Sequence, residues 1–175
     1  MEVRQVRKSD GPLLRELHLR MYADSPNAFG ESLAEAQAMP MERWEGRARK
    51  LAESGHAIGF VAVEGDRAIG FIAAYVGRYR DGSIQHDARQ AVTLTRAWVD
   101  PQARRRGVGQ ALANAVISWA RDRAAQELEV QVTQGNVPAA SLYSRLGFTD
   151  TGRREPLPSN RGVQMCFLIR RLEQA

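Results

Sequence analysis

The chain has 175 residues, and we expect residues 1–175 to form one domain. Its net charge is +5, but the basic residues are dispersed arginines that are not interleaved with aromatic side chains, so a nucleic-acid partner is not favoured. No apolar stretch approaches the roughly 20 residues that span a bilayer, the N-terminus lacks the apolar core of a signal peptide, and the lone Cys166 cannot form an internal disulfide. These features predict a cytoplasmic protein without a membrane partner.

The first half of the chain has the patterns of a strand, two helices and a hairpin. Leu14, Leu17 and Met21 share one face of an expected helix, and the residues around Gly65 have the composition of a hairpin turn. In chain order we expect a strand at 2–7, a helix from about Pro12 to Asp24, a loop at 25–30, a helix at roughly 40–53, and hairpin strands at 57–63 and 68–76.

The second half alternates strands with helices. Leu112, Val116 and Trp119 are spaced for one helix face, and the proline- and glycine-rich stretch before the last strand is typical of a loop. We expect an exposed connection at 78–90, a strand at 91–99, a helix at about 107–123, a strand at 127–133, a helix at 136–147, a strand near 148–152, a loop at 153–162 and a strand at 163–170. This order predicts a mixed α/β sheet.

The segment 104–110, Arg-Arg-Arg-Gly-Val-Gly-Gln, joins a strand to a helix and has the build of a phosphate-binding turn. Glycines allow close approach of the backbone to a ligand, and the start of a helix offers free amides and a positive dipole end. A dinucleotide fingerprint is excluded because Leu112 stands where the third glycine belongs. A Walker-type loop is excluded because the only lysines are Lys8 and Lys50.

A second block, 136–148, predicts a short capped helix. Asn136 is a good N-cap, Pro138 lies in the first turn, and Gly147 follows the helix where a left-handed residue is favoured. This block and the earlier Arg-x-x-Gly-x-Gly pattern resemble, in order and spacing, two motifs of the GNAT superfamily of acyl-CoA N-acyltransferases. The resemblance is strongest over residues 91–150.

The resemblance implies a fold, a cosubstrate and an activity. The fold is a mixed, mostly antiparallel sheet of about seven strands, with helices on both faces and middle strands that splay apart to hold pantetheine. The cosubstrate is acetyl-CoA, no metal is needed, and the acetyl group passes to a primary amine of a small molecule or protein by direct attack in a ternary complex. The residues assigned to the cosubstrate are Ala97, Trp98, Val99, Arg104, Arg105, Arg106, Gly107, Val108, Gly109, Gln110, Asn136 and Tyr143.

Tyr143 is the candidate general acid, because a tyrosine near its reference pKa of about 10 can protonate the leaving thiolate. The base stays open. Many relatives place a glutamate on the strand before the phosphate loop, but residues 88–99 contain no acid, and Thr93 and Thr95 hold the inward positions. Glu129, Glu31 or an ordered water are the alternatives.

Two hints about the acceptor conflict. Phe29 and Glu31 are candidate acceptor contacts in the first loop, and Glu31 suits a cationic amine; the arginines of 153–162 suit an acidic one. A degenerate member that binds acyl-CoA as a regulatory ligand without turnover is the alternative to an enzyme, and the missing strand glutamate is the feature that supports it. Homodimerisation through the C-terminal strands is compatible with the implied fold.

Overall fold

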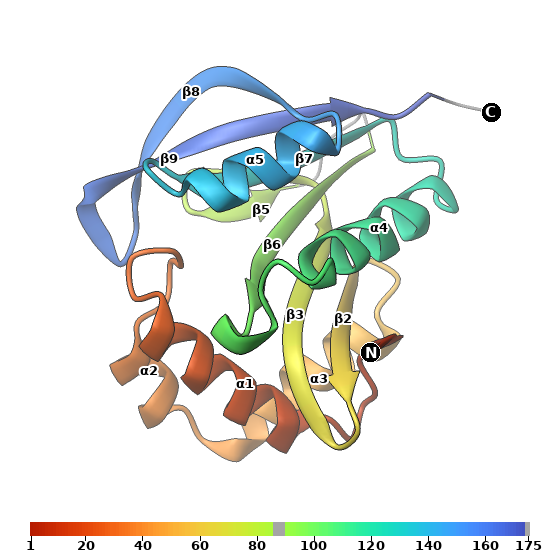
Figure 1. Cartoon of the computed structure of the whole chain (residues 1–175), viewed down its shortest axis with the longest axis vertical. Coiled ribbons are helices and arrows are strands. Elements are labelled where there is room, and N and C mark those ends of the chain that lie inside the picture. Colours follow the sequence, from red (N-terminus) through yellow and green to blue (C-terminus); the bar gives the residue numbers. More distant parts are fainter. Residues whose placement is uncertain (86–89, 174–175) are drawn as a thin grey trace.

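The computed structural model describes residues 1–85 and 90–173, and its centre is a seven-stranded sheet (Figure 1). The strand order is β1-β2-β3-β6-β7-β9-β8, and every neighbouring pair is antiparallel except β6 with β7. In that order the strands are Glu2–Gln5, Ala57–Glu64, Arg67–Val76, Ala91–Val99, Glu127–Thr133, Asn160–Arg171 and Thr149–Leu157. The predicted mixed, mostly antiparallel sheet is confirmed.

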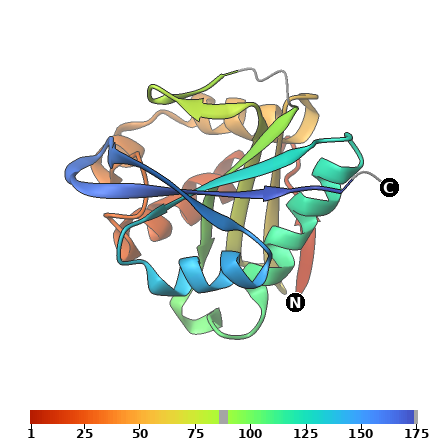
Figure 2. The same ribbon diagram turned by 90° about the horizontal axis from the view of Figure 1, so that it is seen from above.

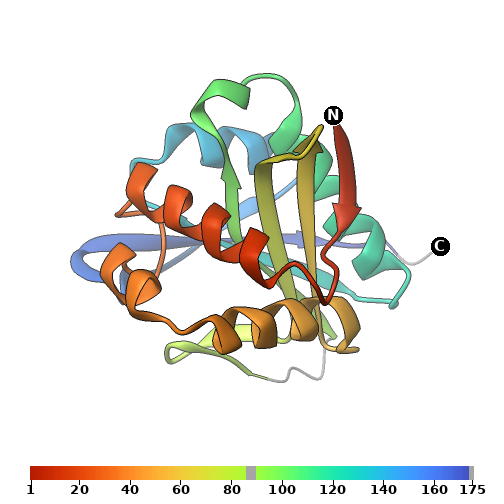
Figure 3. The same cartoon turned by 90° about the horizontal axis from the view of Figure 1, so that it is seen from below.

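Helices cover both faces of this sheet (Figure 3). One face carries α1, α2 and α3, which pack a core around Leu17, Trp44 and Phe71; the other carries α4 and α5, which pack a core around Leu112 and Leu128. The helices are α1 Gly11–Asp24, α2 Leu33–Ala38, α3 Met41–Glu53, α4 Val108–Arg121 and α5 Val137–Arg145, and a 3-10 turn, η1, spans Pro101–Ala103. Among the described residues, no helix is both long and apolar enough to cross a bilayer.

The parallel strands β6 and β7 are paired over only part of their length. Pairing runs from Ala91 with Glu127 to Leu94 with Val130, although β6 continues to Val99 and β7 to Thr133. Beyond Val130 the edge of β7 that faces β6 is unpaired, and the two strands diverge (Figure 2). We call this opening the wedge. It meets the start of α4 and the start of α5, which follow the two diverging strands.

The structure adds one element that was not expected and corrects two expectations about local structure. A helix, α2, lies in the stretch after the first loop, and a short hairpin, β4 (Arg78–Arg80) and β5 (Ser83–Gln85), lies in the expected connection 78–90, of which 86–89 are outside the described residues. The expected loop 153–162 is mostly strand, because β8 extends to Leu157 and β9 begins at Asn160. Pro156 is tolerated there because β8 is an edge strand.

Candidate active site

The turn before α4 presents a row of free backbone amides. Gly107 caps the helix in the left-handed region, with φ of 82°, and a Cβ added there would meet nothing within 4 Å. The amides of residues 105–110 form no hydrogen bond with any part of the chain that the structure describes. Residues 104–107 are exposed. An anion can therefore reach these amides at the positive end of the α4 dipole.

The three arginines of this turn differ in their partners. Arg104 forms an ion pair with Asp24 at the end of α1, and its Nε donates to the carbonyl of Val99 at 3.0 Å. Arg106 forms an ion pair with Glu64 of β2. Arg105 has no acidic partner among the described residues and adopts a left-handed φ of 59°. Only one of the three guanidiniums is thus uncommitted, and the other two also fix the turn in place.

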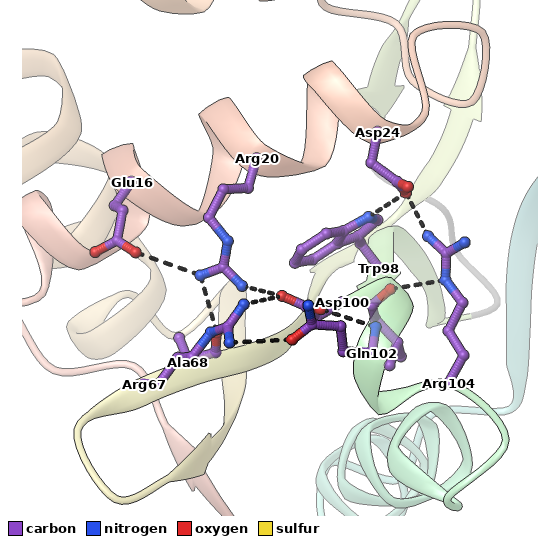
Figure 4. Close-up of polar contacts among 10 residues, drawn as sticks. Glu16, Arg20, Asp24, Arg67, Ala68, Trp98, Asp100, Gln102 and Arg104 are labelled. Atoms are coloured by element: carbon purple, nitrogen blue, oxygen red, sulfur yellow. Dashed lines mark hydrogen bonds and ion pairs between the residues drawn. The ribbon is translucent and has the colours of Figure 1, made fainter.

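A buried carboxylate anchors the turn to the rest of the fold (Figure 4). Asp100 has a side chain that is 7% exposed, pairs with Arg20 of α1, and lies 2.9 Å from the Arg67 guanidinium. Its Oδ1 accepts the Gln102 amide at 3.0 Å and so caps η1. Arg20 also donates to the carbonyl of Ala68 at 3.0 Å. The start of the phosphate-binding turn is therefore held by α1 and by the β2–β3 hairpin.

The free edge of β6 offers backbone groups to the wedge. The Asp100 amide donates to Ile69 of β3 at 2.9 Å, so by strand alternation the backbone groups of Ala97 and Val99 point away from β3, toward the wedge. The Val99 carbonyl is already occupied by Arg104. The Trp98 side chain is buried on the α1 face, where its Nε1 donates to Asp24 at 2.9 Å, so it braces the strand.

A bulge on β6 turns one more side chain toward the α1 face. Register with β3 shifts between Phe71 and Ala73, and Arg96 within the bulge has a φ of 54°. Burial alone lowers the pKa of Arg96, but the neighbouring Tyr75 and Tyr22 outweigh it and the net pKa is raised. The sequence does not single out Arg96, because no local sequence pattern indicates a bulge.

Asn136 caps α5, the helix that follows β7, and Tyr143 lies within this helix. The Asn136 side chain caps α5 by accepting the Ala139 amide at 3.2 Å. Tyr143 is 3% exposed, and its hydroxyl has no hydrogen-bond partner among the described residues. Burial raises the pKa of this hydroxyl, so it stays protonated. Gly109 permits close packing of α4 on α5, because a Cβ there would lie 3.2 Å from Leu142.

Neither Thr93 nor Thr95 is a competent base, and the structure separates the two glutamates that are candidates. Thr93 is fully buried and donates to the Gly77 carbonyl at 2.7 Å. Burial raises the pKa of Glu31, but hydrogen bonds from Arg47 and Tyr22 outweigh burial and lower it to about 2. Glu129 differs, because burial raises its pKa and the Tyr79 amide, at 3.1 Å, does not offset it. Of the two glutamates, Glu129 is the stronger proton acceptor.

The first loop meets the β8–β9 turn (Figure 3). The Phe29 ring packs on Tyr22 at 5.6 Å between centroids, and its carbonyl accepts the Ser159 hydroxyl. Nearby, the Asn160 amide donates to the Asn27 side chain at 3.1 Å. Phe29 is buried and Glu31 is paired with Arg47, so neither of the two expected acceptor contacts is a free side chain. No sequence motif singles out Arg47, which lies on α3.

Comparison with known proteins identifies the fold. The model of the acetyltransferase (GNAT) family matches residues 16–148. This chain belongs to the acetyltransferase (GNAT) family. The match covers the phosphate-binding turn and the Asn136 block, so the resemblance to the GNAT superfamily is confirmed.

Named GNAT relatives act on different amines. The [ribosomal protein bS18]-alanine N-acetyltransferase of Escherichia coli K12 is 31% identical over 111 residues, which are 63% of this chain and 75% of the relative. An aminoglycoside N(6′)-acetyltransferase type 1 of Salmonella enteritidis is 25% identical over 87% of this chain and 94% of its own. The Salmonella typhimurium protein yncA, solved with acetyl-CoA, superposes with a TM-score of 0.75 at 21% identity and covers 100% of this chain and 95% of its own. The prediction of an acetyl-CoA-dependent N-acetyltransferase of the GNAT family is confirmed.

Proposed function

We propose that this GNAT domain, residues 1–175, acetylates a primary amine by direct attack on acetyl-CoA, with the thioester held in the wedge between β6 and β7. The observation that carries the proposal is the end of β6–β7 pairing at Leu94 and Val130, beside a row of free amides at the start of α4. The unpaired strand edges can form backbone hydrogen bonds with a chain that carries amide groups. The free amides at the start of α4 can bind a phosphate.

The amides of residues 105–110 would bind the pyrophosphate, and Arg105 would add a charge-assisted bond. The pantetheine amides would pair with Ala97 and with the Val99 amide, because the Val99 carbonyl is occupied by Arg104. Arg104 and Arg106 would act mainly by holding the turn. Asn136 would contact pantetheine through the part of its side chain that the α5 cap leaves free.

Tyr143 would be the general acid. The amine attacks the thioester carbonyl, the tetrahedral intermediate breaks its C–S bond, and the sulfur takes a proton from the Tyr143 hydroxyl, which solvent then restores. One observation supports this role: the hydroxyl is buried and has no hydrogen-bond partner among the described residues. Burial raises its pKa, which keeps it protonated before the reaction but also makes it a weaker acid than a tyrosine in water. A buried donor without a partner costs free energy in the unbound protein, and a bound sulfur would satisfy it.

Glu129 would accept the proton that the attacking ammonium must lose, through a water molecule. It stands opposite Thr93 in the register of β6 and β7, two residues before Gln131, where the strands have parted. Its side chain projects on the face of the sheet away from α4, while the cosubstrate phosphates bind at α4. The base and the leaving group are then on opposite sides of the wedge, as direct attack requires.

The acceptor is an amine, as it is in the names of both relatives, one a protein and one a small molecule. The test is calorimetric titration with acetyl-CoA, with dephospho-CoA as control, followed by thiol release across a panel of amines. Saturable binding with amine-dependent thiol release supports an acetyltransferase, and binding without release for any amine would make the chain a binder of acyl-CoA. Self-association is a separate proposal, which sedimentation of the purified chain tests.

A further inference from the structure

A hollow of about 470 Å³ lies on the face of β7, β9 and β8 that α4 and α5 leave free. The β4–β5 hairpin borders it, and Tyr79 of β4 packs on Phe167 of β9 with 6.1 Å between ring centroids. Most of the residues that line the hollow are charged, and two of them are buried carboxylates. Its charged residues are Arg78, Arg80, Glu127, Glu129, Arg153 and Arg171.

The two carboxylates of the hollow already have cationic partners. Glu127 is 5% exposed and lies 2.5 Å from the Arg78 guanidinium. Glu129 is 3% exposed and lies 3.7 Å from Arg78 and 3.8 Å from Arg153. Because these carboxylates are shielded by their own guanidiniums, the floor of the hollow repels an anion less than two free carboxylates would.

The two arginines at the rim are uncommitted. Arg80 and Arg171 are exposed, and neither forms an ion pair with another residue in the described ranges. The lining holds four guanidiniums and two carboxylates, and Glu155, which pairs with Arg153 just outside the lining, reduces the excess of positive charge from +2 to +1. A concave site with this excess attracts an anion and disfavours a polycation.

The hollow lies on the side of the wedge from which the amine would approach. Glu129 and Thr93 are register partners on the face that carries α1 to α3, opposite the α4 face. Gln131 lies just beyond the last residue pair of β6 and β7, and Glu129 and Glu127 precede it by two and four residues. At about 3.3 Å per residue, the hollow begins about 7 Å from the wedge and extends to about 13 Å.

We propose that this hollow is an acceptor subsite for a carboxylate, bound by Arg80 and Arg171, and that the preferred acceptor is a peptide with a free N-terminal amine and an acidic side chain near its third residue. The inference rests on the proposed function, because it takes the wedge as the place of the amine. In an extended peptide the third residue lies about 7 Å from the first, which reaches the near edge of the hollow at Glu129. Arg171 starts opposite Glu127 at the far end, so the long side chains of the glutamate and of Arg171 span the rest. A polycationic acceptor such as an aminoglycoside does not fit the charge.

The experiment compares thiol release with two tripeptide amides, Ala-Ala-Glu-NH2 and Ala-Ala-Gln-NH2, and with spermidine as a polycation. We expect kcat/KM about 10-fold higher for the Glu peptide, mainly through KM, because two exposed arginines contribute modestly each. In the double variant R80Q/R171Q the two peptides should become equal. The charge-matched control R49Q/R121Q, which removes two exposed arginines on α3 and α4, should keep the preference.

Equal use of the two peptides by the wild type, preference for spermidine, or a preference that survives R80Q/R171Q overturns the inference while amine acetylation stands. If acetyl-CoA binds but no amine releases thiol, the proposed function fails instead. Calorimetric titration of the two peptides into the coenzyme A-loaded protein then decides the subsite. Tighter binding of the Glu peptide that R80Q/R171Q abolishes supports it, and equal or undetectable binding overturns it.

Discussion

Asp100 offers a quantitative test of how the phosphate-binding turn is held. Replacing it by Ala removes the partly buried bond to Arg20, worth about 1.5 kcal/mol, and the η1 cap on Gln102, worth about 1 kcal/mol. The pair with Arg67, whose side chain is 55% exposed, adds about 0.5 kcal/mol. Asp100→Ala should therefore lower the free energy of unfolding by about 3 kcal/mol. Asp100→Asn keeps an oxygen for the Gln102 amide and should lose about 2 kcal/mol.

For a chain of this length, these changes correspond to Tm decreases of about 6–12 °C for Asp100→Ala and about 4–8 °C for Asp100→Asn. Urea unfolding at pH 7 gives the free energies, and an unchanged m-value shows that the midpoint shift reports stability. Calorimetric titration with acetyl-CoA should show weaker binding in both variants, because the turn loses its anchor to α1.

The pH dependence of the same variants tests the electrostatic part. Burial alone raises the pKa of Asp100, but the Gln102 amide and the guanidiniums of Arg20 and Arg67 outweigh it, so the net pKa lies below its ordinary value. The contribution of the carboxylate is complete above the unfolded pKa of about 3.9 and is lost as pH falls through the lower folded value. The difference in the free energy of unfolding between wild type and Asp100→Asn should therefore begin to shrink below about pH 4 and vanish below the folded pKa of Asp100. A difference that is unchanged at pH 3, or absent at pH 7, would refute this reasoning.

Four further outcomes are expected. Tyr143→Phe should lower kcat about 100-fold without weakening acetyl-CoA binding or stability, since the hydroxyl has no partner to lose; unchanged kcat in a steady-state assay would remove the acid role. Gly107→Val should cost about 1–2 kcal/mol from its φ of 82° and weaken acetyl-CoA binding more than Arg105→Gln does, and calorimetry showing the reverse order would place the affinity in side chains. Glu129→Gln should lower kcat about 100-fold, and kcat of the variant should no longer rise as pH passes the raised pKa of Glu129. If the variant keeps the wild-type dependence of kcat on pH, the base is water. Burial lowers the pKa of His18 to about 3, so the free energy of unfolding of the wild type should fall as pH drops below about 6.5. Urea unfolding at pH 7 and pH 4 should show a smaller fall for His18→Leu. Equal falls would contradict the inference that the His18 ring is neutral in the folded protein.

Periodic elements could be predicted from the sequence, and short ones could not. Helix α4 and the β2–β3 hairpin have enough residues for a clear apolar repeat or turn signal, and they appear where expected. Helix α2 spans only six residues, too few for a visible repeat, although Ser32 and Glu35 form a capping box that was an available signal. The outer part of β8 resembles a loop because it is an edge strand rich in charge, and only Leu157 in it is fully buried.

The site was predictable where it depends on backbone geometry. Gly107 and the Asn136 cap are local features, and both lie as the sequence suggests. The partners of Arg104 and Arg106 are 80 and 42 residues away, so no local pattern could show that these arginines are engaged. Glu31 resembled an open anionic contact for the same reason, since its ion pair with Arg47 forms only when α3 packs beside the first loop.

The contact between the first loop and the β8–β9 turn has a consequence for the shape of the wedge. In the described residues the two halves of the sheet are paired through four residue pairs of β6 and β7, and they are also joined by the packing of α4 on α5 and by the ion pairs of Arg78. Ser159 and Asn160 join the second half to Phe29 and Asn27 of the first, across 130 and 133 residues of chain. This contact is a further point at which the two halves are held together, far along the chain from the β6–β7 pairing. We therefore expect a change in the length of the β8–β9 turn to alter the width of the wedge without replacing any residue that lines it.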